Sequence, residues 1–332
     1  MSFERLFEKY KDLSVAVVGD YCLDEYLWLD AQLNEVSLES GDIAYQSVKQ
    51  TFTPGAAGTI AKNMSLLGAG TVYAVGYIGN DGRGLELSRG LDKLGINKDC
   101  LITSDSRITS TYLKPWLMEE NGVRELNRID IKNWSPTPMH LENEILEKLN
   151  RIIGKIDALV VMDQITEKNC GVITDRVRSE LAKIAAENSK LIVYTDSRNC
   201  VGDFNNMILK GNQHEITRAV FGEEDMNRVA EACAFLQKKS GQPVVCTVGE
   251  KGLRIYDGIN TIEVPGVPLE GPIDVTGAGD NITAGFVLSL AAGADLQTAG
   301  IVGNCCAAIC VSQLGSSGHV TPEDVLKLIS KL

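Results

Sequence analysis

Short apolar runs that alternate with helical patterns constrain the fold of this chain more than any other feature of its sequence. Each run is rich in β-branched residues and almost unbroken in apolarity, as in strands that are covered on both faces. The alternation predicts an α/β fold built on a doubly wound sheet with helices on both faces. Several runs end in Gly or Asp, and ligands of such folds bind at the carboxyl ends of the strands. The runs lie at residues 15–18, 71–79, 158–163, 191–196 and 243–249, and the helical patterns at residues 56–69, 84–95, 174–189 and 226–241.

Two segments, at about residues 27–52 and 109–130, do not follow this alternation. The first has no clear helical period, and the second alternates around the turn signal Glu120-Asn121-Gly122. We expect both segments to add strands outside the main sheet and to pair as a small β-lid over the mouth of the core. No linker, low-complexity tract or repeat divides the chain, so we expect residues 1–332 to form a single domain with this lid inserted in it.

The charge and the cysteine content exclude several classes of protein. The 332 residues carry a formal net charge of −12, so we expect no nucleic-acid partner and no attraction to an anionic membrane. An anionic substrate would need a local basic pocket or backbone N–H donors. The nine cysteines are scattered, without a zinc pattern or a secreted disulfide framework, which predicts buried thiols in a reducing cytosol. His140, His214 and His319 show no metal-ligand spacing, and we expect them to be exposed.

No segment of the chain is typical of membrane insertion or secretion. The longest apolar runs stay well below the ~20 residues that a membrane span requires. Residues 1–13 form a charged amphipathic pattern that lacks the apolar core of a signal peptide. We therefore expect a soluble, cytoplasmic protein.

The segment "DVTGAGD", which ends at Asp280, places a carboxylate directly after three small residues. A Rossmann fingerprint would need a third glycine three positions after Gly279, where the chain has isoleucine, and no P-loop motif occurs. The backbone N–H groups of Gly277, Ala278 and Gly279 can approach a ligand closely and lead into a helix, which predicts an anion hole for a phosphoryl group. Asp280 would stand beside that phosphate and stay ionised near the helix start. Taken alone, Asp280 is as typical of a residue that only stabilises a helix start.

This segment is similar to the signature of the ribokinase-like (PfkB) carbohydrate kinases, in which the aspartate that corresponds to Asp280 is the catalytic base. Four further family motifs occur in the family order, so the resemblance covers nearly the whole chain. It implies a ribokinase-like fold and an enzyme that transfers the γ-phosphate of ATP to a sugar hydroxyl with the help of Mg²⁺. The further motifs are "GDYCLDEY" at residues 19–26, "GNDGRG" at 79–84, "NQHE" at 212–215 and "TVGEKG" at 247–252.

The resemblance also implies roles for single residues. Asp24 corresponds to an aspartate that binds a sugar hydroxyl, and Gly55 and Thr59 stand where the family has residues beside the sugar. Asn212 and Glu215 correspond to residues that organise magnesium and the phosphates. The residues that correspond to the nucleotide loop and the adenine pocket are Thr247, Gly249, Gly252 and Asn304.

Taken singly, these residues are also typical of structural roles. Glu215 could simply open the next helix, and the T-x-G-x-x-G motif resembles a strand end followed by a hairpin turn. Asp24 could be a surface or capping carboxylate. Lys114 and Arg128, on the expected lid, could grip a substrate phosphate or remain solvated charges.

Within the family, the chain is most similar to the D-glycero-D-manno-heptose-7-phosphate 1-kinase half of the bifunctional ADP-heptose enzymes. The segments "VVGDYCLDEYLW", "TPGAAGTIAKNMSLLGA", "TDSRN" and "VSQLGSSG" carry this likeness. A nucleotidyltransferase domain follows in those enzymes, whereas this chain stops at Leu332 and is expected to hold the kinase part alone.

The chain departs from the family where the sugar would bind, and this leaves the acceptor open. The family's Gly-Gly pair is Gly55-Ala56 here, and the usual asparagine three positions later is Thr59. The acceptor is expected to resemble heptose 7-phosphate, and the alternatives are ribose, fructose, a nucleoside, or a non-catalytic protein that binds sugar or nucleotide. Because exposed lid strands are prone to pair with another chain, we also expect a homodimer through the lids.

Overall fold

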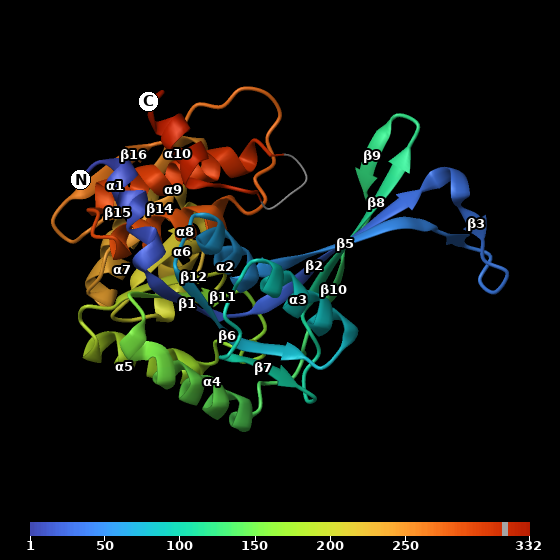
Figure 1. The fold of residues 1–332 in the computed structure, drawn as a ribbon, viewed down its shortest axis with the longest axis horizontal. Helices are drawn as coiled ribbons and strands as arrows, with labels where there is room; N and C mark the ends of the chain where they lie inside the picture. Colours follow the sequence, from blue (N-terminus) through green and yellow to red (C-terminus); the bar gives the residue numbers. More distant parts are fainter. Residues whose placement is uncertain (314–317) are drawn as a thin grey trace.

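Nine strands form the central sheet of the computed structural model, which describes residues 1–313 and 318–332 (Figure 1). In spatial order the strands are β16 (Thr261–Pro265), β15 (Gly252–Tyr256), β14 (Val244–Thr247), β13 (Ile208–Asn212), β12 (Ile192–Ser197), β11 (Ala158–Asp163), β1 (Ser14–Gly19), β6 (Thr71–Gly79) and β7 (Leu101–Ser104). The strands from β14 to β7 are parallel, and β15 and β16 extend one edge as antiparallel strands. The carboxyl ends of the parallel strands therefore meet at one edge of the sheet, where ligands of such folds bind.

Helices cover both faces of this sheet, so the predicted fold class is confirmed. One face packs against α1 (Phe3–Glu8), α2 (Ala57–Leu66), α3 (Gly82–Lys93), α8 (Ala278–Ala291), α9 (Leu296–Val311) and α10 (Pro322–Ile329). The other face packs against α4 (Met139–Ile152), α5 (Asp175–Glu187), α6 (Gln213–Phe221) and α7 (Val229–Ser240). Side chains of β1 alternate between the two cores, with Val15 and Val17 in the first and Ala16 and Val18 in the second. This double coverage explains why the strand is apolar without interruption.

A second sheet of five strands extends away from the helix-covered body (Figure 1). Its strands are β2 (Tyr21–Asp30), β5 (Ser47–Ala56), β8 (Thr111–Glu119), β9 (Gly122–Glu125) and β10 (Ile129–Ile131), and the short pair β3 (Glu35–Val36) and β4 (Ile43–Ala44) lies between β2 and β5 in the chain. Strand β2 pairs with β5 in antiparallel and with β8 in parallel orientation, so the two segments that break the alternation do pair. The first segment is longer than the expected range 27–52, because β2 continues almost directly from β1.

The G-x-D-x-x-G motif joins the two sheets. The Asp81 carboxylate accepts hydrogen bonds from Gly84 N at 2.7 Å, which caps α3, and from Thr109 N at 2.8 Å, two residues before β8. A side chain at Gly84 would lie 2.1 Å from the carbonyl oxygen of Gly79, so only glycine fits there. The motif therefore fixes where the chain enters the second sheet.

The remaining expectations about single residue types also hold. All nine cysteines are free, and eight of them are buried. His140, His214 and His319 are exposed. Among the described residues, no helix combines the length and the apolar character that crossing a membrane would require.

Candidate active site

A cavity of about 470 Å³ lies where the second sheet meets the carboxyl ends of the central strands. Several predicted site residues from distant parts of the chain line it, namely Asp24, Thr59, Lys114, Arg128, Asn212, Glu215, Gly277 and Asp280. The other predicted residues lie outside its lining, namely Gly55, Thr247, Gly249, Gly252, Ala278, Gly279 and Asn304.

The start of α8 forms one wall of the cavity. Gly277 precedes the helix with φ of 78°, a left-handed conformation that favours glycine. The Ala278 N–H donates to the carbonyl oxygen of Val275 at 3.2 Å. The prediction that this amide is available to a ligand is therefore wrong. Within the described residues, the amides of Gly279 and Asp280 have no backbone acceptor. The first turn therefore still offers unpaired donors and the positive end of the helix dipole.

Asp280 lies in the first turn of α8 and is half-buried. Its carboxylate makes no hydrogen bond or ion pair with any residue that the structure describes, and it faces the cavity. Burial and the nearby Asp196 raise the pKa of Asp280 to about 7, although Lys210 and Arg198 lower it. The helix start therefore does not keep this group fully ionised as expected: with a pKa of about 7 the carboxyl is only partly ionised at neutral pH, because burial opposes its charge.

Asn212 and Glu215 form a capping box at the start of α6. The Asn212 Oδ1 accepts a hydrogen bond from Glu215 N at 2.9 Å, and Glu215 Oε2 accepts one from Asn212 N at 2.8 Å. The second oxygen, Glu215 Oε1, lies 3.8 Å from a terminal nitrogen of Arg198 in the cavity. Asn212 and Glu215 thus cap the start of α6 and also line the cavity.

The carboxylate oxygens around the cavity fit a magnesium ion whose other ligands are water and substrate phosphates. The described residues contain no group of three His, Cys, Asp or Glu side chains that could hold a metal by themselves. Glu215 Oε1 and the Asp280 carboxylate are hard oxygen ligands of the kind that Mg²⁺ prefers, and this ion usually keeps waters and substrate phosphates in its shell.

Asp24, on β2, forms an ion pair with Lys114 on the neighbouring strand β8. Lys114 Nζ lies 3.0 Å from Asp24 Oδ1 and donates also to the Tyr26 hydroxyl at 3.3 Å. Lys114 is only 13% exposed, so it is not a solvated lid charge. A side chain on Gly55 would lie 2.9 Å from Asp24 Oδ2, so Gly55 leaves room for this carboxylate although it does not line the cavity.

The two family departures lie side by side at the start of α2. Ala56 precedes the helix with φ of 51° and ψ of −116°, a conformation that residues other than glycine rarely adopt. The buried Thr59 donates its hydroxyl to the carbonyl oxygen of Pro54 at 3.1 Å. At Ala56 the backbone thus keeps a conformation that glycine adopts easily. The hydroxyl of Thr59 is already used in a hydrogen bond to the backbone of Pro54.

Arg128 lines the cavity with a partly exposed side chain. Its guanidinium donates twice to Asp130, at 2.6 and 2.8 Å, and stacks over the Tyr112 ring at 4.9 Å. Its side chain is 49% exposed, which agrees with the alternative of a partly solvated charge.

The T-x-G-x-x-G motif forms the turn between β14 and β15. Thr247 ends β14 beside Asn212, and Gly249 opens a short 3₁₀ turn with φ of 60°. At Gly252 φ is 93°, and a side chain there would lie 2.2 Å from the carbonyl oxygen of Val264. The motif therefore forms a strand end followed by a hairpin turn, as its residue pattern predicts.

Asn304, on α9, binds backbone rather than the cavity. Its amide nitrogen donates to the carbonyl oxygens of Val264 at 3.1 Å and Pro265 at 3.0 Å, and the side chain is buried. It thereby ties α9 to the end of β16.

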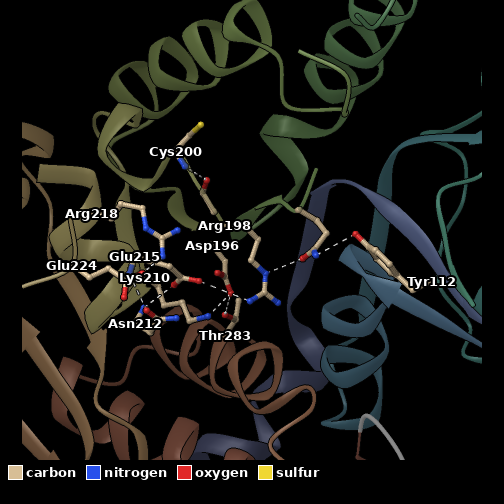
Figure 2. A network of polar contacts seen from close by, with 12 residues as sticks. Tyr112, Asp196, Arg198, Cys200, Lys210, Asn212, Glu215, Arg218, Glu224 and Thr283 are labelled. Carbon is tan, nitrogen blue, oxygen red and sulfur yellow. Dashed lines mark hydrogen bonds and ion pairs between the residues drawn. The ribbon is translucent and has the colours of Figure 1, made fainter. Parts of the chain in front are cut away.

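Sequence reasoning missed the charged residues that surround Asp280, and it also gave no role to Asp130, Lys132 and Arg218 of the cavity lining. Asp196 and Lys210 form a buried ion pair, with Lys210 Nζ 2.6 Å from Asp196 Oδ2, and Arg198 lies in the cavity beside them (Figure 2). Asp196 and Arg198 belong to the segment "TDSRN", whose position at the carboxyl end of a strand was the available signal. Lys210 interrupts an apolar strand, and its partner lies on a separate strand. The segment "VSQLGSSG" falls partly on residues 314–317, outside the described residues.

Comparisons with known proteins agree with this geometry. The family model described as pfkB family carbohydrate kinase matches residues 14–323. The Bifunctional protein HldE of Bradyrhizobium diazoefficiens is 27% identical over 327 residues, which cover 97% of this chain and 64% of that protein. The protein of the same name from Citrifermentans bemidjiense is 28% identical with the same coverage. The chain thus spans 64% of the length of these curated relatives.

Solved structures share the fold. A ribokinase from Thermotoga maritima matches with a TM-score of 0.71 and 21% identity over 96% of this chain and 99% of that chain. The Arabidopsis thaliana ribokinase complexed with ribose and ATP matches with a TM-score of 0.71 and 20% identity over 96% and 98%. At these identities the likeness concerns the fold alone.

Proposed function

Because this chain belongs to the pfkB family of carbohydrate kinases and is a phosphotransferase that acts on a sugar hydroxyl, we propose that it transfers the γ-phosphate of ATP to a phosphorylated sugar. The observation that carries this proposal is the shared cavity, in which Asp280 at the start of α8 faces the same space as Asp24 and Lys114 of the second sheet. A phosphoryl donor at the helix start and an acceptor beside the second sheet would meet there.

A phosphorylated acceptor is supported by the charge of the cavity. The chain as a whole is strongly acidic, with a net charge of −12. The cavity nevertheless brings together five basic side chains, and one of them, Arg198, has no described carboxylate at close range. The basic side chains are Lys114, Arg128, Lys132, Arg198 and Arg218, and the acidic ones are Asp24, Asp130, Glu215 and Asp280. The likeness of the motifs to heptose-7-phosphate kinases and the similarity to HldE proteins favour an acceptor that resembles heptose 7-phosphate.

In the proposed reaction, Asp280 orients the acceptor hydroxyl and takes its proton. The unpaired amides of Gly279 and Asp280 would hold oxygens of the γ-phosphate, with Gly277 giving the backbone its turn. The bond from the γ-phosphorus to the bridging oxygen of ADP breaks while the bond to the sugar oxygen forms. Since the transition state of this transfer is loose, the hydroxyl loses its proton late and a moderate base suffices.

Magnesium would be held by Glu215 near Asn212, with phosphates and water completing its shell. When bound, the ion neutralises the charge of the phosphates. For the nucleotide, we propose that it extends toward the turn formed by Thr247, Gly249 and Gly252, because Thr247 lies next to Asn212 in the sheet. Asn304 would act there through the backbone of β16 that it holds.

The second sheet would act as a lid and as a dimer surface. A lid excludes water, which would otherwise accept the phosphoryl group. Its strands and the adjoining pair β3–β4 carry exposed apolar side chains, including Val36, Ile43, Val48, Val123 and Ile129. We propose that a second copy of the chain covers these side chains, and that the protein works in the cytoplasm, where ATP is available and free cysteines stay reduced.

An acceptor panel tests the proposed function. The chain is incubated with ATP and Mg²⁺ and with heptose 7-phosphate, fructose 6-phosphate, fructose, ribose or a nucleoside, and ADP and the phosphorylated product are measured. We expect the highest kcat/KM with heptose 7-phosphate. A preference for an unphosphorylated acceptor would overturn the proposed substrate class, and ATP binding in calorimetry without product from any acceptor would indicate a non-catalytic protein.

A further inference from the structure

Arg198 occupies a junction between the two halves of the cavity. It follows β12 directly, at the carboxyl edge of the central sheet, and lines the same cavity as Asp280. On one side its guanidinium approaches Glu215, in the first turn of α6 (Figure 2). On the other side its Nε donates a hydrogen bond to Gln164 Oε1 at 3.1 Å. A ligand that spans the cavity would pass this guanidinium.

Arg198 differs from the other lysines and arginines that line the cavity, because no described carboxylate lies at close range to it. Each of the other four has a carboxylate partner at short range. These pairs are Lys114–Asp24 at 3.0 Å, Arg128–Asp130 at 2.6 Å, Lys132–Glu167 at 3.1 Å, and Arg218–Glu224. Within the described residues, the one ion pair of Arg198 is the 3.8 Å approach to Glu215 Oε1, and Asp196 and Asp280 act on its charge from farther away. Within the described part of the chain, its two terminal amino groups make no hydrogen bond, and half of its side chain is exposed.

The guanidinium is nevertheless held in place at its inner end. The backbone N–H of Arg198 donates to the carbonyl oxygen of Asp163 at 3.0 Å, and its Nε is bound to Gln164. Gln164 in turn donates to the Tyr112 hydroxyl at 3.3 Å and is anchored through its backbone N–H to the buried Asp20 at 2.9 Å. These contacts use Nε and leave the two terminal amino groups as a fork without a close partner. Such a fork matches two oxygens of one phosphoryl group.

We propose that Arg198 is a catalytic residue, which donates from both terminal amino groups to two non-bridging oxygens of the phosphoryl group during transfer. This inference rests on the proposed kinase function. The phosphorus–oxygen bond to ADP breaks, the bond to the acceptor oxygen forms, and the acceptor proton passes to Asp280. The charge that spreads over the transferred oxygens would be met by the guanidinium on one side and by the α8 amides on the other.

Variants of Arg198 test this role with the wild-type chain and the best acceptor of the panel. We expect Arg198→Ala to lower kcat by about 10²–10³-fold while the KM values for ATP and acceptor change little. Arg198→Lys keeps the charge but loses the fork, and we expect it to remain at least about tenfold below the wild type. Arg89→Ala is the matched control, because Arg89 is an exposed arginine on α3 that pairs with Glu86 of the same helix. Circular dichroism and melting curves confirm that each variant is folded.

Chemical rescue separates a catalytic guanidinium from a structural one. We expect millimolar guanidinium chloride to restore part of the kcat of Arg198→Ala, whereas equal sodium chloride has no effect and Arg89→Ala responds to neither. The inference is overturned if Arg198→Ala keeps its kcat, if only the KM for the acceptor rises, if Arg198→Lys equals the wild type, or if guanidinium gives no rescue. A wild-type chain that phosphorylates no acceptor would instead remove the proposed function itself, so the two failures are distinguishable.

Discussion

Lys210 and Asp196 form a buried ion pair directly against the start of α8. Lys210 Nζ lies 2.6 Å from Asp196 Oδ2 and 2.8 Å from the position that a side-chain carbon on Gly279 would take. The two residues are register partners on β12 and β13, and Thr283 of α8 donates to the same Asp196 oxygen at 3.4 Å. One ion pair thus joins two central strands to the helix that carries Asp280.

Lys210→Met should destabilise the protein strongly, because it leaves Asp196 buried without its partner. We expect the free energy of unfolding, measured with denaturant, to fall by about 3–5 kcal/mol. The double variant Lys210→Met with Asp196→Asn is the control, since removing the charge of both residues should recover much of the loss. A single variant as stable as the wild type would contradict the structural role of the pair.

The activity should depend on the ionisation of Asp280. Since the pKa of Asp280 is raised to about 7 and the base must be deprotonated, we expect kcat/KM to rise with pH through about 7 and to fall about tenfold per unit below it. The stability should change in the opposite sense. A carboxyl group with a raised pKa stabilises the folded state most below its unfolded pKa, and this contribution is lost as the pH rises through 7. A pH–rate profile that is flat between pH 5 and 8 would contradict this assignment.

Ala56→Gly should stabilise the chain. The Ala56 backbone, with φ of 51° and ψ of −116°, is strained for alanine but not for glycine, and such strain costs about 1–3 kcal/mol. Glycine also makes the unfolded chain more flexible, which offsets part of this relief of strain. We therefore expect the free energy of unfolding, measured with denaturant, to rise by on the order of 1 kcal/mol. Ala57→Gly, one position later and within α2, should instead lower the stability. Equal losses in both variants would show that Ala56 is not strained.

Gly55→Ala should weaken acceptor binding without affecting ATP. The added carbon would lie 2.9 Å from Asp24 Oδ2, so the carboxylate must move away from its position beside Lys114. We expect the KM for the acceptor to rise by about tenfold, as for the loss of one good polar contact, while calorimetry finds unchanged ATP affinity. Gly82→Ala is the matched control, because a side chain there meets no atom within 4 Å. An unchanged KM would remove Asp24 from the acceptor site.

Local apolar patterns were sufficient to predict most of the central sheet. Strands β1, β6, β11, β12 and β14 coincide with unbroken apolar runs. Strand β13 was missed because Lys210 interrupts it, and a lysine is tolerated in this buried place only because Asp196 lies beside it in the register. The pairing of β2 with β8 was expected, but its extent was underestimated because β2 continues the line of β1.

The site could be predicted where its residues share one local motif. Gly277 and Asp280 lie three residues apart in one segment and were identified together. Arg198 was not given a role, because its neighbours Gln164 and Glu215 come from other strand ends. The raised pKa of Asp280 also could not be predicted, since the helix start is visible in the sequence and the burial is not.

The phosphoryl transfer rate of Asp280→Asn tests the central claim most directly. The substitution keeps the size of the side chain and removes the base, so the variant should fold, bind ATP like the wild type and lose kcat by on the order of 10²-fold or more. Product formation from ATP and the preferred acceptor is measured for both chains under the same conditions, with ATP affinity from calorimetry. If the variant phosphorylates the acceptor at the wild-type rate, Asp280 is not the base and the proposed use of this cavity is wrong.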